Sequence, residues 1–300
     1  MSLAGLTTRV LARFEYAAPT SLEAALDLLG RHGEAARPLA GGTDLLLQMR
    51  RGRMRPAVLV DLKRVPGLAG IENGGGLRIG ALASHADLVA SPLAAAPARR
   101  ALAEAARCVS GPQIRNRGTV GGNLCNASPA ADLAPPLLAL GAAVEVARRG
   151  APVRTLPAER LFAGPGRTVL SPGDLLVGIA LPAAAARTGS AYERATRVAI
   201  DIALVGVAAC VTLAADGTVA EARVALGAVA PTPILAAGAA AALVGRAPEP
   251  AALAAAARAA AADARPITAV RASADYRRHM VEVLARRALA RAVAAARSPR

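Results

Sequence analysis

Apolar and polar positions in the first 64 residues alternate in a way typical of a small α/β unit. Apolar residues after Ser21 recur at helical spacing, so Ser21 is predicted to cap a helix that Gly30 and Gly33 end. We expect a strand at 14–16, a helix at 22–29 and a strand at 37–40. A glycine turn at 41–44, a helix at 45–47 and a strand at 57–61 follow. This order predicts strands and helices packed in layers.

A second region continues to residue 184 with shorter elements. We expect a strand at 76–81, a helix at 98–108 and a turn-rich stretch at 110–132. An apolar segment at 137–146 and a strand at 175–179 follow. Small residues at 183–189 form a connector, which we take as a domain boundary. The predicted domains are 1–184, with subdomains of about 1–64 and 65–184, and 185–300.

The third region predicts a small antiparallel sheet followed by helices. Ile202 to Leu213 is predicted as a buried strand, Asp216-Gly217 as a hairpin turn and Val219 to Leu226 as its partner. Alanine-rich stretches around Ala239 and Ala254 are predicted to be ordinary closely packed helices. A final helix is predicted from near Asp275, with one apolar face made by Met280, Leu284, Ala288 and Val293.

Composition supports a sizeable core without large aromatic side chains. Apolar residues make up 54% of the 300-residue chain, and Trp is absent. The formal charge of +15 raises the possibility of nucleic-acid binding. However, the arginines are scattered without aromatic interleaving, and Lys63 is the one lysine, so codon bias or docking to acidic partners explains the charge better.

The cysteine content favours a reducing compartment, and the hydropathy favours a protein without a membrane span. Cys108, Cys125 and Cys210 are too few and too widely spaced for a disulfide framework or a clustered metal site. Arg9 and Arg13 interrupt any apolar stretch at the N-terminus, so we expect no secretory signal. The longest apolar run, residues 202–215, is shorter than the roughly 20 residues of a membrane span. We therefore expect a soluble, cytoplasmic protein.

Two glycine-containing loops are the strongest candidates for ligand binding. The first, Ala40-Gly41-Gly42-Thr43-Asp44-Leu45-Leu46, lies between an expected strand and helix. Paired glycines allow backbone amides to approach a ligand closely, and a following helix start favours an anion such as a pyrophosphate. The spacing matches neither a Walker loop nor G-x-G-x-x-G. A tight turn without a ligand would have the same composition.

The second loop runs from Gly118 to Asp132. It combines Gly121-Gly122 with the polar side chains of Thr119, Asn123, Asn126, Ser128 and Asp132. So many polar groups in an apolar chain need partners, and a ligand would supply them. The carboxylate of Asp132 suits ribityl or ribose hydroxyls. A hydrogen-bonded surface turn is the alternative.

Together, the loops resemble the flavin subunit of the xanthine dehydrogenase and carbon monoxide dehydrogenase family. The similarity continues in the same order through Gln113-Ile114-Arg115-Asn116, Ala191-Tyr192-Glu193-Arg194, Asp201-Ile202-Ala203 and Ser273-Ala274-Asp275-Tyr276-Arg277. It spans nearly the whole chain. The resemblance implies an α+β fold, with two α/β subdomains that clamp FAD and a C-terminal α+β domain with a small antiparallel sheet and helices.

The resemblance also implies a set of residues for noncovalent FAD binding. The pyrophosphate would lie at Leu39, Ala40, Gly41, Gly42, Thr43, Asp44, Leu45 and Leu46. The ribityl chain and ring would pass Val109, Thr119, Gly121, Gly122, Asn123, Asn126 and Asp132, with Leu176 and Arg194 near the ring. Relatives often have a lysine where this chain has Arg194, and some have an aromatic residue at the position of Val109.

Histidines and cysteines exclude some variants of this chemistry. Neither loop contains a histidine, so a histidyl-linked flavin is not expected, and His32, His85 and His279 are predicted to be surface or capping residues. Cys108 and Cys125 cannot hold an extra iron–sulfur cluster, which usually takes four cysteines. Cys125 is predicted to be a small buried residue.

By resemblance, the chain relays electrons and does not act on a substrate itself. Its FAD would receive electrons from the [2Fe-2S] clusters of a small subunit, whose partner is a large subunit carrying the molybdenum cofactor, in a dimer of heterotrimers. The FAD would pass them to an external acceptor. We find no nucleophile–base pair, paired carboxylates or metal-ligand cluster. The alternatives are a self-contained FAD-dependent oxidase and a non-catalytic nucleotide- or nucleic-acid-binding protein.

Overall fold

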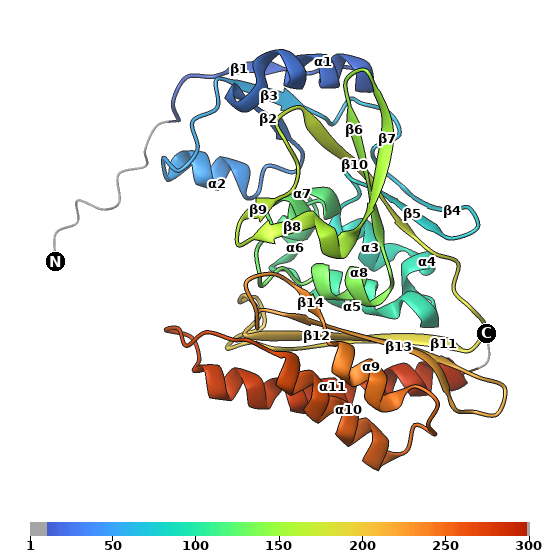
Figure 1. The fold of residues 1–300 in the computed structure, drawn as a ribbon. Coiled ribbons are helices and arrows are strands. Elements are labelled where there is room, and N and C mark those ends of the chain that lie inside the picture. Colours follow the sequence, from blue (N-terminus) through green and yellow to red (C-terminus); the bar gives the residue numbers. More distant parts are fainter. Residues whose placement is uncertain (1–10, 299–300) are drawn as a thin grey trace.

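A computed structural model describes residues 11–298 of the chain (Figure 1). The expectation of no N-terminal signal depends partly on Arg9, which lies outside this range. The structure combines four sheets with helices, so the predicted α+β class is confirmed. No helix in the described range is long and apolar enough to cross a membrane.

The first sheet contains three parallel strands in the order β1-β3-β2. Its elements are β1 (Glu15–Ala17), α1 (Leu22–His32), η2 (Gly33–Ala35), β2 (Ala36–Leu39), α2 (Leu45–Arg50) and β3 (Val58–Asp61). Ser21 caps α1 as predicted, since its hydroxyl accepts a hydrogen bond from the Ala24 amide at 3.1 Å. Gly30 does not end the helix, which continues to His32 and stops where Gly33 adopts φ +50°.

The second sheet is antiparallel and has the order β4-β5-β10-β6-β7. Its strands are β4 (Ile71–Asn73), β5 (Leu77–Gly80), β6 (Ala143–Arg148), β7 (Ala151–Pro157) and β10 (Asp174–Leu181). The predicted apolar segment 137–146 is divided between helix α8 (Ala134–Ala139) and β6. The chain reverses at Gly141, whose φ of +67° favours glycine.

Short helices cover this sheet and occupy the middle of the molecule (Figure 1). They are α3 (His85–Ala90), α4 (Pro92–Ala95), η3 (Pro97–Arg99), α5 (Arg100–Cys108), α6 (Pro112–Arg115), α7 (Val120–Cys125) and η4 (Ala158–Leu161). A two-stranded sheet of β8 (Phe162–Gly164) and β9 (Arg167–Thr168) follows η4. The stretch predicted as turn-rich, 110–132, therefore contains two helices of four and six residues.

The C-terminal part has a four-stranded antiparallel sheet in the order β11-β12-β13-β14. It comprises β11 (Thr188–Ala195), β12 (Val205–Leu213), β13 (Val219–Gly227), β14 (Ile234–Leu235), α9 (Ala237–Leu243), α10 (Pro250–Asp263) and α11 (Ala274–Arg297). The predicted hairpin and helices are present. The first strand begins at Val205, not at Ile202, which is 41% exposed, and β11 already begins at Thr188 inside the predicted connector. Figure 1 shows this sheet with α5 and α8 on one face and α9, α10 and α11 on the other.

Small residues allow close packing where larger side chains are scarce. A Cβ atom on Gly189 of β11 would lie 2.2 Å from the carbonyl oxygen of Ala292, so α11 approaches the strand at backbone distance. Three buried apolar clusters fill the molecule. One joins the parallel sheet to β6 and β10, one joins the five-stranded sheet and the central helices to the C-terminal sheet, and one lies between the C-terminal sheet and its helices. Alanine, valine and leucine make up most of each cluster, in line with the expectation from composition.

Candidate functional site

The first glycine loop (residues 40–46) connects the end of β2 to the start of α2. Gly42 adopts φ +78°, a left-handed conformation that favours glycine. The backbone amides of Gly42, Thr43 and Asp44 donate no hydrogen bond to another described residue. This loop therefore presents unpaired donors next to a backbone turn that only glycine adopts easily.

The two glycine loops touch each other through their backbones. A Cβ atom on Gly41 would lie 1.9 Å from the carbonyl oxygen of Arg117 and 3.2 Å from the Cα atom of Gly118. Because real Cβ atoms do not approach this closely, only glycine permits the contact. A second link joins α2 to the end of α7, where the Gln48 side-chain amide donates to the Asn126 Oδ1 atom at 3.3 Å.

The second glycine loop (residues 118–132) is held against the segment that follows β5. The Val120 amide donates to Ala83 and the Gly121 amide to Ala81, both at 2.9 Å. A Cβ atom on Gly121 would lie 2.8 Å from the Ala81 carbonyl oxygen. Thr119, 7% exposed, caps α7 by accepting the Gly122 amide at 3.1 Å. Gly121 thus brings α7 close to the segment that follows β5.

Asn123 has a buried polar atom without a partner. Its Oδ1 atom is inaccessible to solvent and accepts no hydrogen bond within the described structure. An unsatisfied buried acceptor costs about 1–3 kcal/mol, so such atoms usually point to a missing ligand or water. Asn123 is one of the residues predicted to line the cofactor path.

Asp132 pairs with the C-terminal sheet. Its carboxylate accepts the Tyr192 hydroxyl at 2.8 Å and the Arg194 Nη1 atom at 3.1 and 3.2 Å. Burial raises the pKa of the Asp132 carboxyl, and the charge and hydrogen bond of Arg194 and the bond from Tyr192 oppose that rise. Burial and the neighbouring carboxylate also raise the pKa of Tyr192. The predicted residues Asp132 and Arg194 therefore form one buried ionic cluster.

Val109 and Leu176 lie in different surroundings. Val109 ends α5, and its carbonyl accepts the Arg115 guanidinium at 3.2 Å. Leu176 of β10 is 4% exposed and belongs to the same apolar cluster as Val120 and Leu124 of α7. Leu176 thus packs beneath the second loop.

Two predictions about individual side chains are wrong. His85, expected at the surface or as a cap, is 2% exposed and lies beneath Gly118, where burial and the charge of Arg115 lower its pKa to about 4. Cys125, expected to be buried, is exposed at the last position of α7.

Sequence reasoning also missed several residues that position the loops. Arg115 donates to Val109 and Ser110, and Gln48 bridges the two loops. Ser110 and Ala127 adopt φ values of +42° and +47°, which are uncommon for residues other than glycine. The Ser84-to-Asp87 capping box before the second loop was a visible signal, since each group bonds the other's backbone amide.

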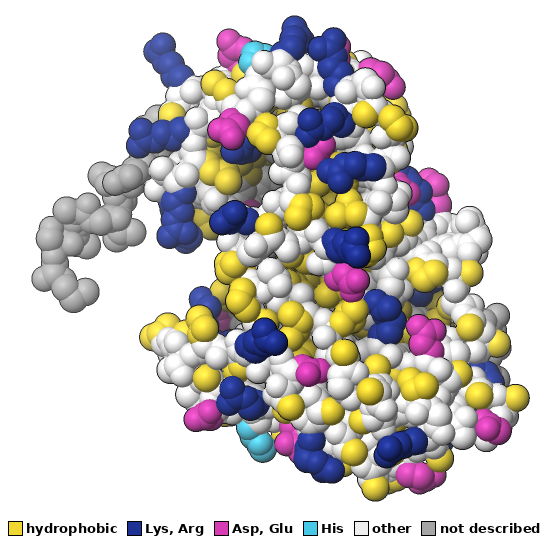
Figure 2. All heavy atoms as spheres, in the orientation of Figure 1, with side chains coloured by type: hydrophobic (Ala, Val, Ile, Leu, Met, Phe, Trp, Pro, Cys, Tyr) yellow, Lys and Arg dark blue, Asp and Glu magenta, His cyan; other side chains and the backbone are white. Residues whose placement is uncertain are grey.

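These features fit a dinucleotide cofactor. Unpaired amides at residues 42–44 suit an anionic pyrophosphate, and the orphaned Asn123 oxygen can accept a hydrogen bond from a hydroxyl. Figure 2 shows the surface hollowed below α2, with hydrophobic side chains on the wall of the recess, while basic side chains are dispersed over the visible face. No group of three or more His, Cys, Asp or Glu residues in the described chain could hold a metal.

Comparison with known proteins defines the class. Residues 12–184 match the family model described as the FAD binding domain in molybdopterin dehydrogenase, and residues 190–292 match the CO dehydrogenase flavoprotein C-terminal domain. The site and the two matches define a flavoprotein. The chain belongs to the family of FAD-binding subunits of molybdenum hydroxylases.

Individual relatives agree over nearly the full length. The carbon monoxide dehydrogenase medium chain of Hydrogenophaga pseudoflava is 39% identical over 279 residues, covering 92% of this chain and 96% of the relative. The xanthine dehydrogenase FAD-binding subunit of Escherichia coli O157:H7 is 34% identical, covering 94% and 96%.

Solved structures share the fold. A carbon monoxide dehydrogenase from Hydrogenophaga pseudoflava that lacks the Mo-pyranopterin moiety gives a TM-score of 0.90 at 40% identity, covering 95% of this chain and 99% of the other. Quinoline 2-oxidoreductase from Pseudomonas putida 86 gives 0.88 at 30% identity, covering 96% and 100%.

Proposed function

We propose that this chain binds FAD noncovalently at the two glycine loops and relays electrons from the [2Fe-2S] clusters of a small partner subunit to an external acceptor. A large subunit carrying the molybdenum cofactor would complete a dimer of heterotrimers. The observation that carries the proposal is the backbone contact between Gly41 and Arg117, which brings both loops to one place. When bound, FAD supplies the redox chemistry, and the protein supplies its position and electrostatic surroundings.

Different residues would bind the pyrophosphate, the ribityl chain and the ring of the cofactor. The amides of Gly42, Thr43 and Asp44 would hold the pyrophosphate, supported by Leu39, Ala40, Gly41, Leu45 and Leu46. Thr119, Gly121, Gly122, Asn123 and Asn126 would hold the ribityl chain, where the Asn123 oxygen would gain its missing partner. Val109, Leu176 and Arg194 would border the ring.

Asp132 would influence the bound cofactor mainly by holding the guanidinium of Arg194 in place. Its two carboxylate oxygens already accept three hydrogen bonds from Tyr192 and Arg194. A carboxylate has about four acceptor positions, so one remains for a ribityl hydroxyl. The pair would hold a guanidinium charge close to the cofactor and would keep the second loop joined to β11.

We propose that the FAD-binding domain spans residues 1–184 and the C-terminal domain 185–300. The separate sheets on either side of the connector support this boundary, as do the matches at 12–184 and 190–292. Subdomains of about 1–64 and 65–184 correspond to the parallel and antiparallel sheets. Limited proteolysis that cleaves first between 182 and 189 would support the boundary, and first cleavage elsewhere would contradict it.

We further propose a cytoplasmic location, supported by the three free cysteines in the described chain. Fractionation of source cells should place the chain with soluble cytoplasmic enzymes. Recovery in a membrane or secreted fraction would contradict this.

Reconstitution tests the function. The purified chain should show a flavin spectrum, release its FAD on denaturation and pass electrons from a chemical reductant to a dye. It should not oxidise purines, aldehydes, N-heterocycles or carbon monoxide until the iron–sulfur and molybdenum subunits are added. Substrate oxidation by the chain alone would favour a self-contained oxidase, and a colourless chain that binds nucleic acid would favour a binding protein.

A further inference from the structure

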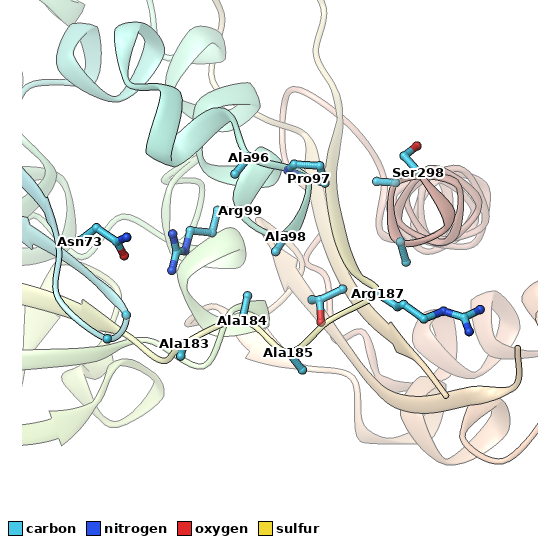
Figure 3. Close-up of a pocket in the computed structure, with 15 residues that line it drawn as sticks. Asn73, Ala96, Pro97, Ala98, Arg99, Ala183, Ala184, Ala185, Arg187 and Ser298 are labelled. Carbon is cyan, nitrogen blue, oxygen red and sulfur yellow. The ribbon is translucent and has the colours of Figure 1, made fainter. Parts of the chain in front are cut away.

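A pocket of about 500 Å³ lies where four parts of the chain meet. Its walls come from the turn between β4 and β5, the residues around η3, and the connector from β10 to β11, with the end of α11 closing one side (Figure 3). None of its lining residues belongs to either glycine loop. This junction pocket is therefore separate from the candidate flavin site.

Arg99 is an unpaired cation in the wall of the junction pocket. Its guanidinium makes no hydrogen bond or ion pair with another described residue. Burial lowers the pKa of Arg99, because the charge loses hydration without gaining a carboxylate partner. Figure 3 shows its side chain extending toward the part of the pocket that Asn73 lines.

The second arginine of the pocket is occupied elsewhere. Arg187 donates to the carbonyl oxygen of Ala215 at 3.0 Å, and Figure 3 shows its side chain directed away from Arg99. No Asp or Glu among the described residues lines the junction pocket. The described lining therefore offers one free guanidinium and no carboxylate side chain.

The remaining walls are small and mostly apolar. Alanine methyl groups from η3, the connector and α11 line the pocket, together with Pro97 and the backbone of Gly75 and Gly76. A planar guanidinium pairs best with a carboxylate, through two parallel hydrogen bonds. Asn73, Thr188 and Ser298 add uncharged polar groups to the lining. One positive charge and a mostly apolar surround favour a monoanion with a short hydrophobic body over phosphate, which carries more charge.

We propose that the junction pocket binds a small organic carboxylate, with its carboxyl group on Arg99 and its apolar body against the alanine walls. The ligand would contact the antiparallel sheet, the connector and α11 together. The site does not depend on the FAD assignment, because the two sets of residues are separate.

To test the proposal, we would measure the binding of benzoate to the purified full-length chain by isothermal titration calorimetry. Benzamide has the same shape without the charge, and inorganic phosphate has the charge without the apolar body. We expect benzoate to bind at least about tenfold more tightly than either probe, because a charged pair adds roughly 1.5–3 kcal/mol, equivalent to tenfold to a hundredfold. Equal affinity for benzoate and benzamide, or a preference for phosphate, would overturn the proposal.

A pair of neighbouring substitutions locates the site. Arg99→Met should weaken benzoate binding by about tenfold to a hundredfold, whereas Arg100→Met should leave it unchanged, since Arg100 is exposed and does not line the pocket. Arg99→Lys keeps the charge without the planar fork and should give an intermediate loss. An unchanged affinity in Arg99→Met would overturn the proposal. If that variant does not fold, the comparison of benzoate with benzamide on the unmodified chain still decides.

Discussion

The carboxylate of Asp132 and the guanidinium of Arg194 lie 3.1 Å apart, and each side chain is only 9% exposed. Asp132 ends the second glycine loop, while Arg194 belongs to β11 of the C-terminal sheet. Arg194 also donates to the carbonyl oxygens of Ala199 and Asp201. One buried ion pair therefore connects a predicted cofactor loop to the sheet that follows the connector.

Removing the Asp132 carboxylate should leave the buried guanidinium of Arg194 without its charged partner. We expect Asp132→Ala to lower the free energy of unfolding by about 3 kcal/mol, measured by urea denaturation. FAD affinity should fall about tenfold to a hundredfold, by loss of a charged acceptor. Asp275→Ala is the matched control, because Asp275 is 95% exposed and pairs with Arg278 at the surface, so its loss should cost less than about 1 kcal/mol. Unchanged stability and FAD affinity in Asp132→Ala would contradict the role of this pair.

Gly41 should tolerate no side chain. In Gly41→Ala the new methyl group would collide with the Arg117 carbonyl, so the two loops must separate. We expect loss of bound FAD after gel filtration, while far-ultraviolet circular dichroism stays close to that of the unmodified chain. Gly74→Ala serves as the control, since nothing lies within 4 Å of a Cβ atom there. Stoichiometric flavin in Gly41→Ala would show that the loop contact does not support the cofactor.

Stability should depend on pH through His85. Its folded pKa of about 4 lies below the unfolded value of 6.5, so the unfolded chain binds the proton more readily. The free energy of unfolding should therefore fall as pH decreases from 6.5 toward 4, by up to about 3 kcal/mol from this residue. His85→Gln should flatten that part of the pH profile, and His279→Gln, at an exposed position, should not. Identical profiles for all three proteins would rule out a buried neutral His85.

The local elements of this fold could be predicted from sequence. Ser21 before an apolar 3.6-residue period indicates a capped helix, and Asp216-Gly217 between apolar runs indicates a hairpin, and both are present. The secondary structure of segment 137–146 was harder to predict. Helix α8 and strand β6 are both apolar, and periodicity does not separate two short buried elements.

Long-range contacts could not be predicted from periodicity. Gln48 and Asn126 are 78 positions apart, and no local pattern indicates that α2 meets the end of α7. The family resemblance placed both loops at one cofactor, but it did not indicate that Asp132 is engaged by Tyr192 and Arg194. His85 was missed for a similar reason, since its burial depends on Gly118, 33 positions further along the chain.

Assembly with partner subunits should depend on salt. Arg50, Arg51, Arg53 and Arg55 are exposed around the end of α2 and form no ion pair with another described residue. Replacing all four with Gln should slow association with the proposed iron–sulfur subunit about tenfold at low ionic strength and weaken its salt dependence, because charge mainly accelerates encounter. Stopped-flow mixing at increasing salt concentrations would measure both effects.

The matched control for assembly removes the same charge from another surface. Arg258, Arg286, Arg287 and Arg297 are exposed on α10 and α11, and replacing them with Gln lowers the net charge by the same four units. If the surface at α2 guides docking, this control should slow association much less than the variant at residues 50–55. Equal slowing would mean that overall charge governs the encounter, and no slowing in either variant would assign the basic composition to codon usage.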